Sequence, residues 1–227
     1  MPEKKRTNKH LLIWLFVCIC GTGFAQKDYR AESITITDGL SQGFVMCLYA
    51  DSRGFTWIGT FNGLNRYDGY KVKRFPPDQA TPWALKANYI YCITEDKQGL
   101  LWMGTDKGLV VMDPHTERIV NLSDLNSAFP SRDVVQIIVR DNNRIWCSYR
   151  SPKGPKVIMV QPAGNLMQSI RADKIREDLI QMQEVPIPDG IKGPLRWLDS
   201  GNGSDIFAID ASEQFCRIDP LSLQVQK

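Results

Sequence analysis

Short runs of β-forming residues alternate with turn residues along most of the chain. The first group contains four runs, which are Phe44 to Ala50, Thr56 to Thr60, Leu64 to Tyr67 and Lys71 to Phe75. Turn residues separate these runs, namely Asp51-Ser52-Arg53-Gly54, Asn62-Gly63 and Asp68-Gly69. Asn-Gly and Asp-Gly supply the positive φ angles that tight hairpins need. The pattern therefore predicts four antiparallel strands joined by tight turns.

The whole group recurs 45 residues later in the chain. Leu40 to Asp68 aligns without a gap to Leu85 to Asp113, and the two segments share residues at many equivalent positions. The matching pairs are Cys47 with Cys92, Gly54 with Gly99, Trp57 with Trp102, Gly59 with Gly104, Gly63 with Gly108, and Asp68 with Asp113. A decayed third copy, Val134 to Trp146, and a fainter fourth, Ile206 to Pro220, follow. A period of this length is typical of propellers, solenoids or arrays.

Strand chemistry favours a propeller, because four antiparallel strands per repeat make one blade. The first run is apolar on both faces, which suits a strand enclosed between neighbouring blades. We therefore expect an all-β fold over residues 26–227, a β-propeller of about three to four four-stranded antiparallel blades. An insertion is expected at about residues 150–195. Within it, Arg171 to Glu184 has a ragged apolar stripe that predicts either a helix or an ordered loop.

Charge is concentrated at the N-terminus. The chain has 28 basic and 25 acidic residues, of which four basic and one acidic lie in the first ten positions; 28 − 4 and 25 − 1 both leave 24. The remaining chain is neutral, so its charge gives no reason to expect a nucleic-acid partner.

The same segment resembles a secretory signal peptide. Leu11 to Cys20 is an apolar run, and Gly23-Phe24-Ala25 predicts cleavage near Ala25. We expect a signal peptide over residues 1–25 and a periplasmic or otherwise secreted protein; an uncleaved anchor is the alternative. No later window has ~20 apolar residues, so no membrane span is expected in the mature chain.

Few residues suggest chemistry. The cysteines Cys47, Cys92, Cys147 and Cys216 lack metal-ligand spacing and lie in apolar runs, which favours free core thiols. Trp57, Trp102 and Trp146 recur once per blade, which favours packing over sugar binding. Asp51 and Asp96 fit Asx-type turns better than calcium ligation. His115 lies alone in a turn. We therefore expect no catalytic residue, no metal and no cofactor.

Propeller ligands usually bind where loops converge at one end of the channel, so residues there that break the repeat are the better candidates. They are Phe61-Asn62, Asp106-Lys107 and the irregular basic loop Arg150 to Lys156. The sequence assigns none of them as a site.

The unit D-x-x-G-x-x-W-x-G-T-x-x-G-L resembles the two-component regulator propeller repeat. It occurs as Asp51, Gly54, Trp57, Gly59, Thr60, Gly63 and Leu64, and again as Asp96, Gly99, Trp102, Gly104, Thr105, Gly108 and Leu109. Thr37-Asp38-Gly39-Leu40-Ser41 resembles the start of the first propeller in hybrid two-component sensors of gut Bacteroidetes. The resemblance implies a periplasmic sensor region, an oligosaccharide ligand and homodimerisation through that region. In the family, a second propeller, a β-sandwich, a membrane span, a histidine kinase and a response regulator follow.

The chain ends at Lys227, before any of these parts, and has no counterpart of the kinase motifs. We therefore expect a truncated sensor without kinase or hydrolase activity. The alternatives are a cell-surface or secretion-associated scaffold and, third, a propeller lyase or hydrolase. We also expect an incomplete ring in which a strand at Ser33 to Thr37 lacks its partner, which would favour aggregation; a closed four-bladed ring is the alternative.

Overall fold

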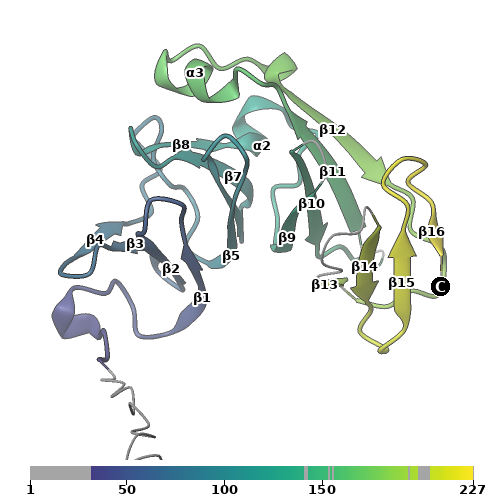
Figure 1. Cartoon of the computed structure of the whole chain (residues 1–227), viewed down its shortest axis with the longest axis horizontal. Coiled ribbons are helices and arrows are strands. Elements are labelled where there is room, and N and C mark those ends of the chain that lie inside the picture. The colour runs from purple at the N-terminus through teal and green to yellow at the C-terminus, as the bar shows by residue number, and fades with distance from the viewer. Residues whose placement is uncertain are drawn as a thin grey trace, which may run out of the picture. The chain divides into compact units, whose positions relative to one another are not determined.

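The computed structural model describes residues 32–140, 143–152, 154, 156–193, 195–198 and 205–226. Residues Ile34–Lys227 form one compact unit. It contains four four-stranded antiparallel sheets, which confirms the predicted all-β propeller fold class (Figure 1). The predicted signal peptide, residues 1–25, lies outside the described residues.

The first two sheets correspond to the two clear repeats. Blade 1 contains β1 (Val45–Ala50), β2 (Thr56–Thr60), β3 (Gly63–Tyr67) and β4 (Val72–Phe75). Blade 2 contains β5 (Ile90–Glu95), β6 (Leu101–Thr105), β7 (Gly108–Asp113) and β8 (Arg118–Asn121). The strands of blade 1 begin and end within one residue of the predicted runs.

The decayed repeats also form complete sheets. Blade 3 contains β9 (Val134–Arg140), β10 (Arg144–Tyr149), β11 (Lys156–Pro162) and β12 (Ile180–Val185). Blade 4 contains β13 (Arg196–Leu198), β14 (Ile206–Ile209), β15 (Phe215–Ile218) and β16 (Val225–Gln226). The short helices are η1 (Ile36–Asp38), α2 (Leu122–Leu125), α3 (Leu166–Arg171) and η2 (Glu177–Leu179). None of the helices in the described ranges is long and apolar enough to cross a membrane.

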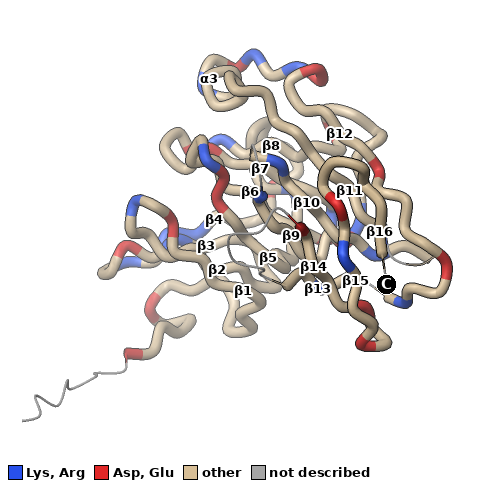
Figure 2. Tube along the Cα trace, turned by 45° about the vertical axis from the view of Figure 1, so that its right-hand side comes forward, with Lys and Arg blue, Asp and Glu red and all other residues tan. Residues whose placement is uncertain are grey.

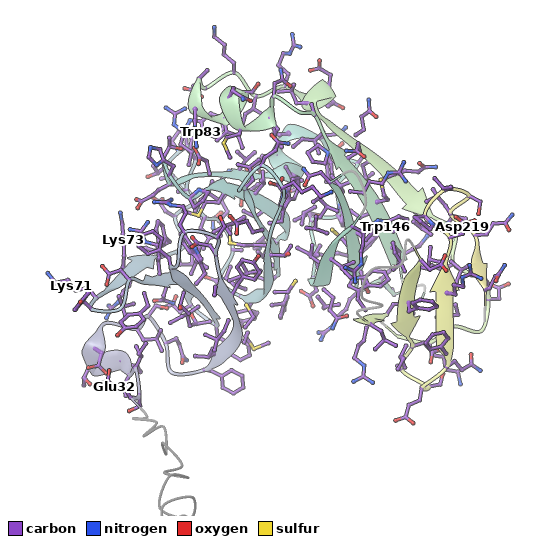
Figure 3. The ribbon with its side chains drawn as sticks, in the orientation of Figure 1. Glu32, Lys71, Lys73, Trp83, Trp146 and Asp219 are labelled. Carbon is purple, nitrogen blue, oxygen red and sulfur yellow. The ribbon has the colours of Figure 1, made fainter. Side chains whose placement is uncertain are left out.

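Consecutive blades pack through their first strands and share apolar clusters. Strand β1 contacts β5, β5 contacts β9, and β9 contacts β13. Three clusters of buried side chains lie between blades 1 and 2, 2 and 3, and 3 and 4. Each contains one repeated tryptophan: Trp57, Trp102 and Trp146 in that order, all 0% exposed. Figure 3 shows Trp146 between the last two blades.

The two outer blades of this row do not adjoin each other. Figure 1 shows blade 1 and blade 4 at opposite ends of the row. Large apolar side chains on blade 1 are exposed, among them Phe44 (57%) and Leu48 (66%). The sequence predicts that both faces of β1 are enclosed by neighbouring blades. The face that carries Leu48 is uncovered in this structure. Figure 2 shows basic and acidic residues interspersed along the described part of the trace, on strands as well as turns.

The repeated aspartate closes a loop and holds the tryptophan. Oδ1 of Asp51 accepts hydrogen bonds from the backbone N–H groups of Arg53 (3.0 Å) and Phe55 (2.9 Å), and Oδ2 accepts one from Nε1 of Trp57 (2.8 Å). Asp96 repeats this arrangement, with Trp102 Nε1 at 2.9 Å. The prediction of Asx-type turns is confirmed. The aspartate also satisfies the only polar atom of the buried indole ring.

The repeated Gly59 and Gly104 allow the next blade to approach. A Cβ on Gly59 would lie 2.9 Å from Cβ of Ile90 at the start of β5. A Cβ on Gly104 would lie 2.3 Å from the backbone oxygen of Val134 at the start of β9. No real Cβ tolerates these distances, so glycine at this position is a requirement of blade packing.

A second contact joins each aspartate loop to the following blade. The backbone N–H of Ser52 donates to Oε2 of Glu95 (2.7 Å), and the Ser52 hydroxyl donates to Oε1 (2.6 Å). One repeat later, the backbone N–H of Lys97 donates to Oδ1 of Asn143 (2.7 Å). We call these contacts the loop latches; in both, the donor is the residue that follows the repeated aspartate.

In the described part of the chain, no disulfide joins Cys47, Cys92, Cys147 or Cys216. Cys147 and Cys216 are buried, while Cys47 and Cys92 are half-buried. Burial raises the pKa of Cys47 to about 12, and it raises the pKa of Cys92 further. These thiols therefore stay protonated near neutral pH and are poor nucleophiles.

The strand predicted at Ser33 to Thr37 is wrong. This segment leads into the 3₁₀ helix η1 because Asp38 folds back on Thr35. The Asp38 carboxylate accepts hydrogen bonds from the backbone N–H (2.8 Å) and the hydroxyl (2.7 Å) of Thr35. Gly39 then ends the turn at φ 108°, a left-handed conformation that favours glycine.

Of the two structures expected at Arg171 to Glu184, the helix is wrong, and the ordered loop is present only between Arg171 and η2. Helix α3 ends at Arg171, and Ile180–Val185 forms β12, which pairs with β11 along its length. The local pattern explains this, because Ile180 and Met182 alternate with glutamines as in a strand. Much of the range expected as an insertion therefore belongs to blade 3. The excursion that carries α3 and η2 stands between its outer two strands.

An ion pair fastens this excursion to blade 2. Asp113, at the end of β7, is fully buried, and its carboxylate accepts hydrogen bonds from Nε (2.7 Å) and Nη2 (3.2 Å) of Arg171. Burial raises the pKa of Asp113, but hydrogen bonds from Arg171, Thr116 and His115 outweigh it and lower the value to about 2. The folded state therefore strongly prefers the ionised carboxylate.

This ion pair predicts acid sensitivity. The folded pKa of Asp113 lies below its usual value of 3.8, so its contribution is present above about pH 4 and is lost as the pH falls towards 2. The contribution is about 2 kcal/mol. Urea unfolding of the wild type and Asp113→Asn should show a stability difference near neutral pH that shrinks by about this amount at pH 2. A constant difference across this range would contradict the assignment.

Candidate functional site

The three candidate segments of the sequence lie at the same end of the blades. In each blade the second connection lies at the end where the first strand begins. Phe61-Asn62 joins β2 to β3, Asp106-Lys107 joins β6 to β7, and the loop that begins at Arg150 joins β10 to β11. Antiparallel order therefore gathers loops from three consecutive blades at one end of their inner strands. We call this end the loop face. Residues 153 and 155 of the third loop lie outside the described residues.

Four aromatic rings form a row across the loop face. Phe44 stacks on Phe61 with ring centroids 4.4 Å apart and an interplanar angle of 14°. Phe61 lies 4.8 Å from Tyr89, and Tyr89 lies 6.4 Å from Tyr91 in an edge-on arrangement. Phe44 is 57% exposed and Tyr89 41% exposed. This aromatic row runs from blade 1 to the inner strand of blade 2 and presents rings to solvent.

Backbone contacts position the row. The N–H of Phe61 donates to the carbonyl of Phe44 (3.4 Å), and one repeat later the N–H of Asp106 donates to the carbonyl of Tyr89 (3.2 Å). The Asp106 carboxylate in turn accepts hydrogen bonds from the N–H groups of Asn88 and Tyr89, both at 3.1 Å. Asp106 therefore fixes the backbone that carries Tyr89.

The row ends in a polar group contributed by blade 3. The Arg150 guanidinium lies 6.0 Å from the ring centroid of Tyr91 and 3.3 Å from the Asp133 carboxylate. Its side chain is 60% exposed. Burial and the neighbouring Asp133 carboxylate raise the pKa of Tyr91 to about 12. The Tyr91 hydroxyl is therefore protonated near neutral pH and can donate a hydrogen bond. The Arg150 guanidinium has five N–H donors and is exposed, so it can also donate hydrogen bonds to a ligand.

A cavity of about 470 Å³ lies beside this polar group. It is lined by the segment Ser127, Ala128, Phe129, Pro130, Ser131 and Arg132 before β9, and by Tyr149, Ser151 and Pro152 around the β10–β11 loop. Its lining residues adjoin Asp133 and Arg150 in sequence, so the cavity continues the loop face into blade 3. The volume is within the range of small-molecule sites.

The arrangement is suited to non-covalent binding of a ligand. Exposed rings pack against the apolar faces of a ligand, and the polar end supplies directional hydrogen bonds. Across the parts of the chain that the structure describes, no group of three or more His, Cys, Asp or Glu side chains could hold a metal ion. His115 is exposed in the β7–β8 turn, at the opposite end of the blades.

Sequence reasoning missed Phe44, Tyr89 and Tyr91. The candidate ligand-binding residues were those that differ between repeats. Phe44 and Tyr89 are both aromatic and occupy equivalent positions 45 residues apart, so this criterion excluded them. The feature that could have identified them is an aromatic residue that recurs at one position of the repeat and is exposed in both blades. Tyr91 lies within β5, and nothing in the sequence separates it from the other residues of that strand.

Comparison with known proteins identifies the repeats. The family described as two component regulator propeller matches residues 39–62 and 84–107. Histidine kinase P4 of Formosa agariphila is 39% identical over 57 residues, which are 24% of this chain and 4% of the kinase. The matched residues therefore represent a very small part of that relative.

Two solved structures share the fold. The extracellular domain of a B. thetaiotaomicron protein described as a one-component system superposes with a TM-score of 0.62 at 19% identity, over 88% of this chain and 27% of that one. PorZ, a surface component of the type-IX secretion system of Porphyromonas gingivalis, gives 0.56 at 14% identity, over 81% of this chain and 26% of PorZ. The chain spans about a quarter of each structure. Residues 39–62 and 84–107 thus match the two component regulator propeller repeat, and the chain that contains them has a β-propeller fold.

Proposed function

We propose that the chain is an extracytoplasmic ligand-sensing propeller region whose ligand is an oligosaccharide bound along the aromatic row. The observation that carries this proposal is the row itself, with Phe44, Phe61 and Tyr89 in succession and Arg150 at its end. Extended exposed rings are costly to leave in water and suit a partner with its own flat apolar faces. The faces of pyranose rings have this character, while their hydroxyl groups need the hydrogen bonds that the polar end offers.

The family match supports a sensor role for such a site. Proteins of similar fold include an extracellular domain of a one-component system, and the curated relative is a histidine kinase. A sensor region needs a binding surface that is accessible from outside, and the loop face provides one. The fold similarity to PorZ keeps a secretion-associated scaffold as the alternative.

The test is a binding screen of the chain against a panel of neutral and acidic oligosaccharides of three to six sugar units. We expect saturable binding of at least one member. Tyr89→Ala should then weaken that binding about tenfold, the effect of losing roughly 1.4 kcal/mol of ring contact. Titration calorimetry measures the change.

Tyr70→Ala is the matched control. Tyr70 is 92% exposed and lies in the β3–β4 turn, at the opposite end of blade 1 from the loop face. Its removal should leave oligosaccharide affinity unchanged. Absence of binding across the panel, or equal losses in the two variants, would refute the proposal and favour the scaffold alternative.

A further inference from the structure

A separate cavity lies at the end of the blades opposite the loop face. Its volume is about 280 Å³. A cavity of ~150 Å³ holds one benzene molecule, so this one has room for roughly ten non-hydrogen atoms. It lies where the aspartate loops of blades 1 and 2 meet the β7–β8 turn and helix α3. Among the residues that line it are Arg53, Glu95, Asp113, Pro114, Met167 and Arg171.

The two arginines of the cavity keep N–H donors that no residue in the described part of the chain uses. Nη1 of Arg53 donates to the backbone oxygen of Pro114 (3.0 Å). Nε and Nη2 of Arg171 donate to the Asp113 carboxylate (2.7 and 3.2 Å). A guanidinium has five N–H groups, so each side chain retains some of them for a ligand. The Arg171 side chain is 42% exposed and that of Asp113 is fully buried, so a molecule in the cavity meets the guanidinium rather than its partner.

Glu95 supplies acceptors in the same cavity. Its Oε1 and Oε2 each accept one hydrogen bond from Ser52 in the loop latch (2.6 and 2.7 Å), and each oxygen has a second lone pair. The residue is half-buried. A Cβ on Gly99 would lie 3.7 Å from Oε1 of Glu95 and 3.8 Å from Cε of Met167. The glycine therefore leaves space beside the carboxylate, and the methionine methyl group lies next to that space.

The charges of the cavity favour a zwitterion over a simple ion. Arg53 and Arg171 contribute two positive charges. Glu95 and Asp113 contribute two negative charges, and with His115 counted as neutral the sum is zero. A lone anion is attracted by the guanidinium groups but repelled by the carboxylates, and a lone cation meets the reverse. A molecule that carries both charges can place each one beside its opposite, so it gains at both ends.

We propose that this cavity binds a free α-amino acid with a small or medium-sized apolar side chain. The carboxylate of the ligand accepts hydrogen bonds from the unused N–H groups of Arg53 and Arg171, and its ammonium group donates to Glu95. Its side chain packs against Met167. The proposal does not depend on oligosaccharide binding at the loop face, because the two sites share no residue and lie at opposite ends of the blades.

The experiment compares L-alanine with two derivatives that each lack one charge. N-acetyl-L-alanine has no ammonium group, and L-alaninamide has no carboxylate. Saturation-transfer NMR titrations of the full chain at pH 7 should show saturable binding of L-alanine and of L-leucine. Each derivative should bind at least about tenfold more weakly than L-alanine, because it loses hydrogen bonds between charged groups. Equal affinities for L-alanine and either derivative would overturn the zwitterion assignment, and this comparison needs no variant.

Two arginine variants locate the binding. Arg53→Gln should weaken the binding of L-alanine about tenfold, because it removes one of the two guanidinium groups that face the carboxylate. Arg176→Gln is the matched control, since Arg176 is 72% exposed, pairs with Asp178 and lies outside the cavity. It should leave the affinity unchanged. Absence of saturable binding of both amino acids, or equal losses in the two variants, would overturn the site.

Glu95→Gln tests the other end of the ligand. The substitution removes the negative charge beside the ammonium group but keeps an amide oxygen that can accept a hydrogen bond from Ser52. We expect the affinity for L-alanine to fall towards that for N-acetyl-L-alanine, while N-acetyl-L-alanine binds no more weakly than before. A preference for L-alanine that is unchanged in this variant would overturn the role of Glu95.

Discussion

Trp102→Ala should destabilise the chain by about 3–5 kcal/mol, the cost of removing a large buried aromatic side chain from a packed core. Trp102 is 0% exposed and belongs to the apolar cluster between blades 2 and 3. The substitution leaves a cavity between the blades. It also removes the hydrogen bond that Nε1 of Trp102 donates to Oδ2 of Asp96 (2.9 Å). Urea unfolding monitored by circular dichroism measures the loss.

Tyr70→Ala provides the comparison, because it removes an aromatic side chain that is 92% exposed. We expect a change within about 0.5 kcal/mol, as for surface substitutions in general. A Trp102→Ala protein that melted like the wild type but no longer bound ligand would show that this tryptophan serves recognition rather than packing.

Gly104→Ala should cost at least ~2 kcal/mol, because the new methyl group meets backbone that cannot rotate away. The added Cβ would lie 2.3 Å from the carbonyl oxygen of Val134 and 2.6 Å from Sγ of Cys92. Relief of this clash requires β9 to move away from β6, which opens the contact between blades 2 and 3. The expected result is a lower midpoint in urea.

Gly164→Ala is the matched control for this substitution. A Cβ on Gly164 would meet no atom within 4 Å, and its φ lies outside the left-handed region. The same chemical change should therefore be neutral or slightly stabilising, since alanine restricts the unfolded chain. Similar losses at the two glycines would contradict the account of Gly104 as a blade contact.

The regular part of the fold could be predicted because its strands end at turn residues with specific backbone requirements. Gly63 and Gly108 both have positive φ angles, 84° and 106°, where the repeat predicts hairpin turns. The repeat also predicted the roles of Asp51 and Trp57, because a residue that recurs once per blade performs the same packing task in each. Local chemistry and repetition were sufficient for these elements.

The elements that the sequence did not predict depend on distant partners or on one unexpected side chain. Strand β12 forms because it pairs with the free edge of β11, about 20 residues earlier in the chain. The alternation of apolar and polar residues in β12 is short, and a window long enough to test for a helix does not detect it. The Asp38 side chain stabilises the turn at Thr35 through two hydrogen bonds that the strand-like pattern of Ser33 to Thr37 does not reveal. The aromatic row and the polar group at its end bring Phe61, Tyr89 and Arg150 together from three blades, and the spacing of these residues along the chain does not indicate that they meet.

The loop latches determine which positions at a blade junction can vary in sequence. Each latch has a backbone N–H donor, of Ser52 or of Lys97, which every residue except proline possesses, and in the first latch the Ser52 hydroxyl donates as well. Only the acceptor in the next blade must be a side-chain oxygen, and a carboxylate (Glu95) and an amide (Asn143) both suffice. Most substitutions of the residue after the repeated aspartate thus keep the backbone donor, and the next blade needs only one side-chain oxygen as the acceptor. The donor position can therefore vary in sequence without loss of the latch, whereas the close approach at Gly59 and Gly104 still restricts which blades can adjoin.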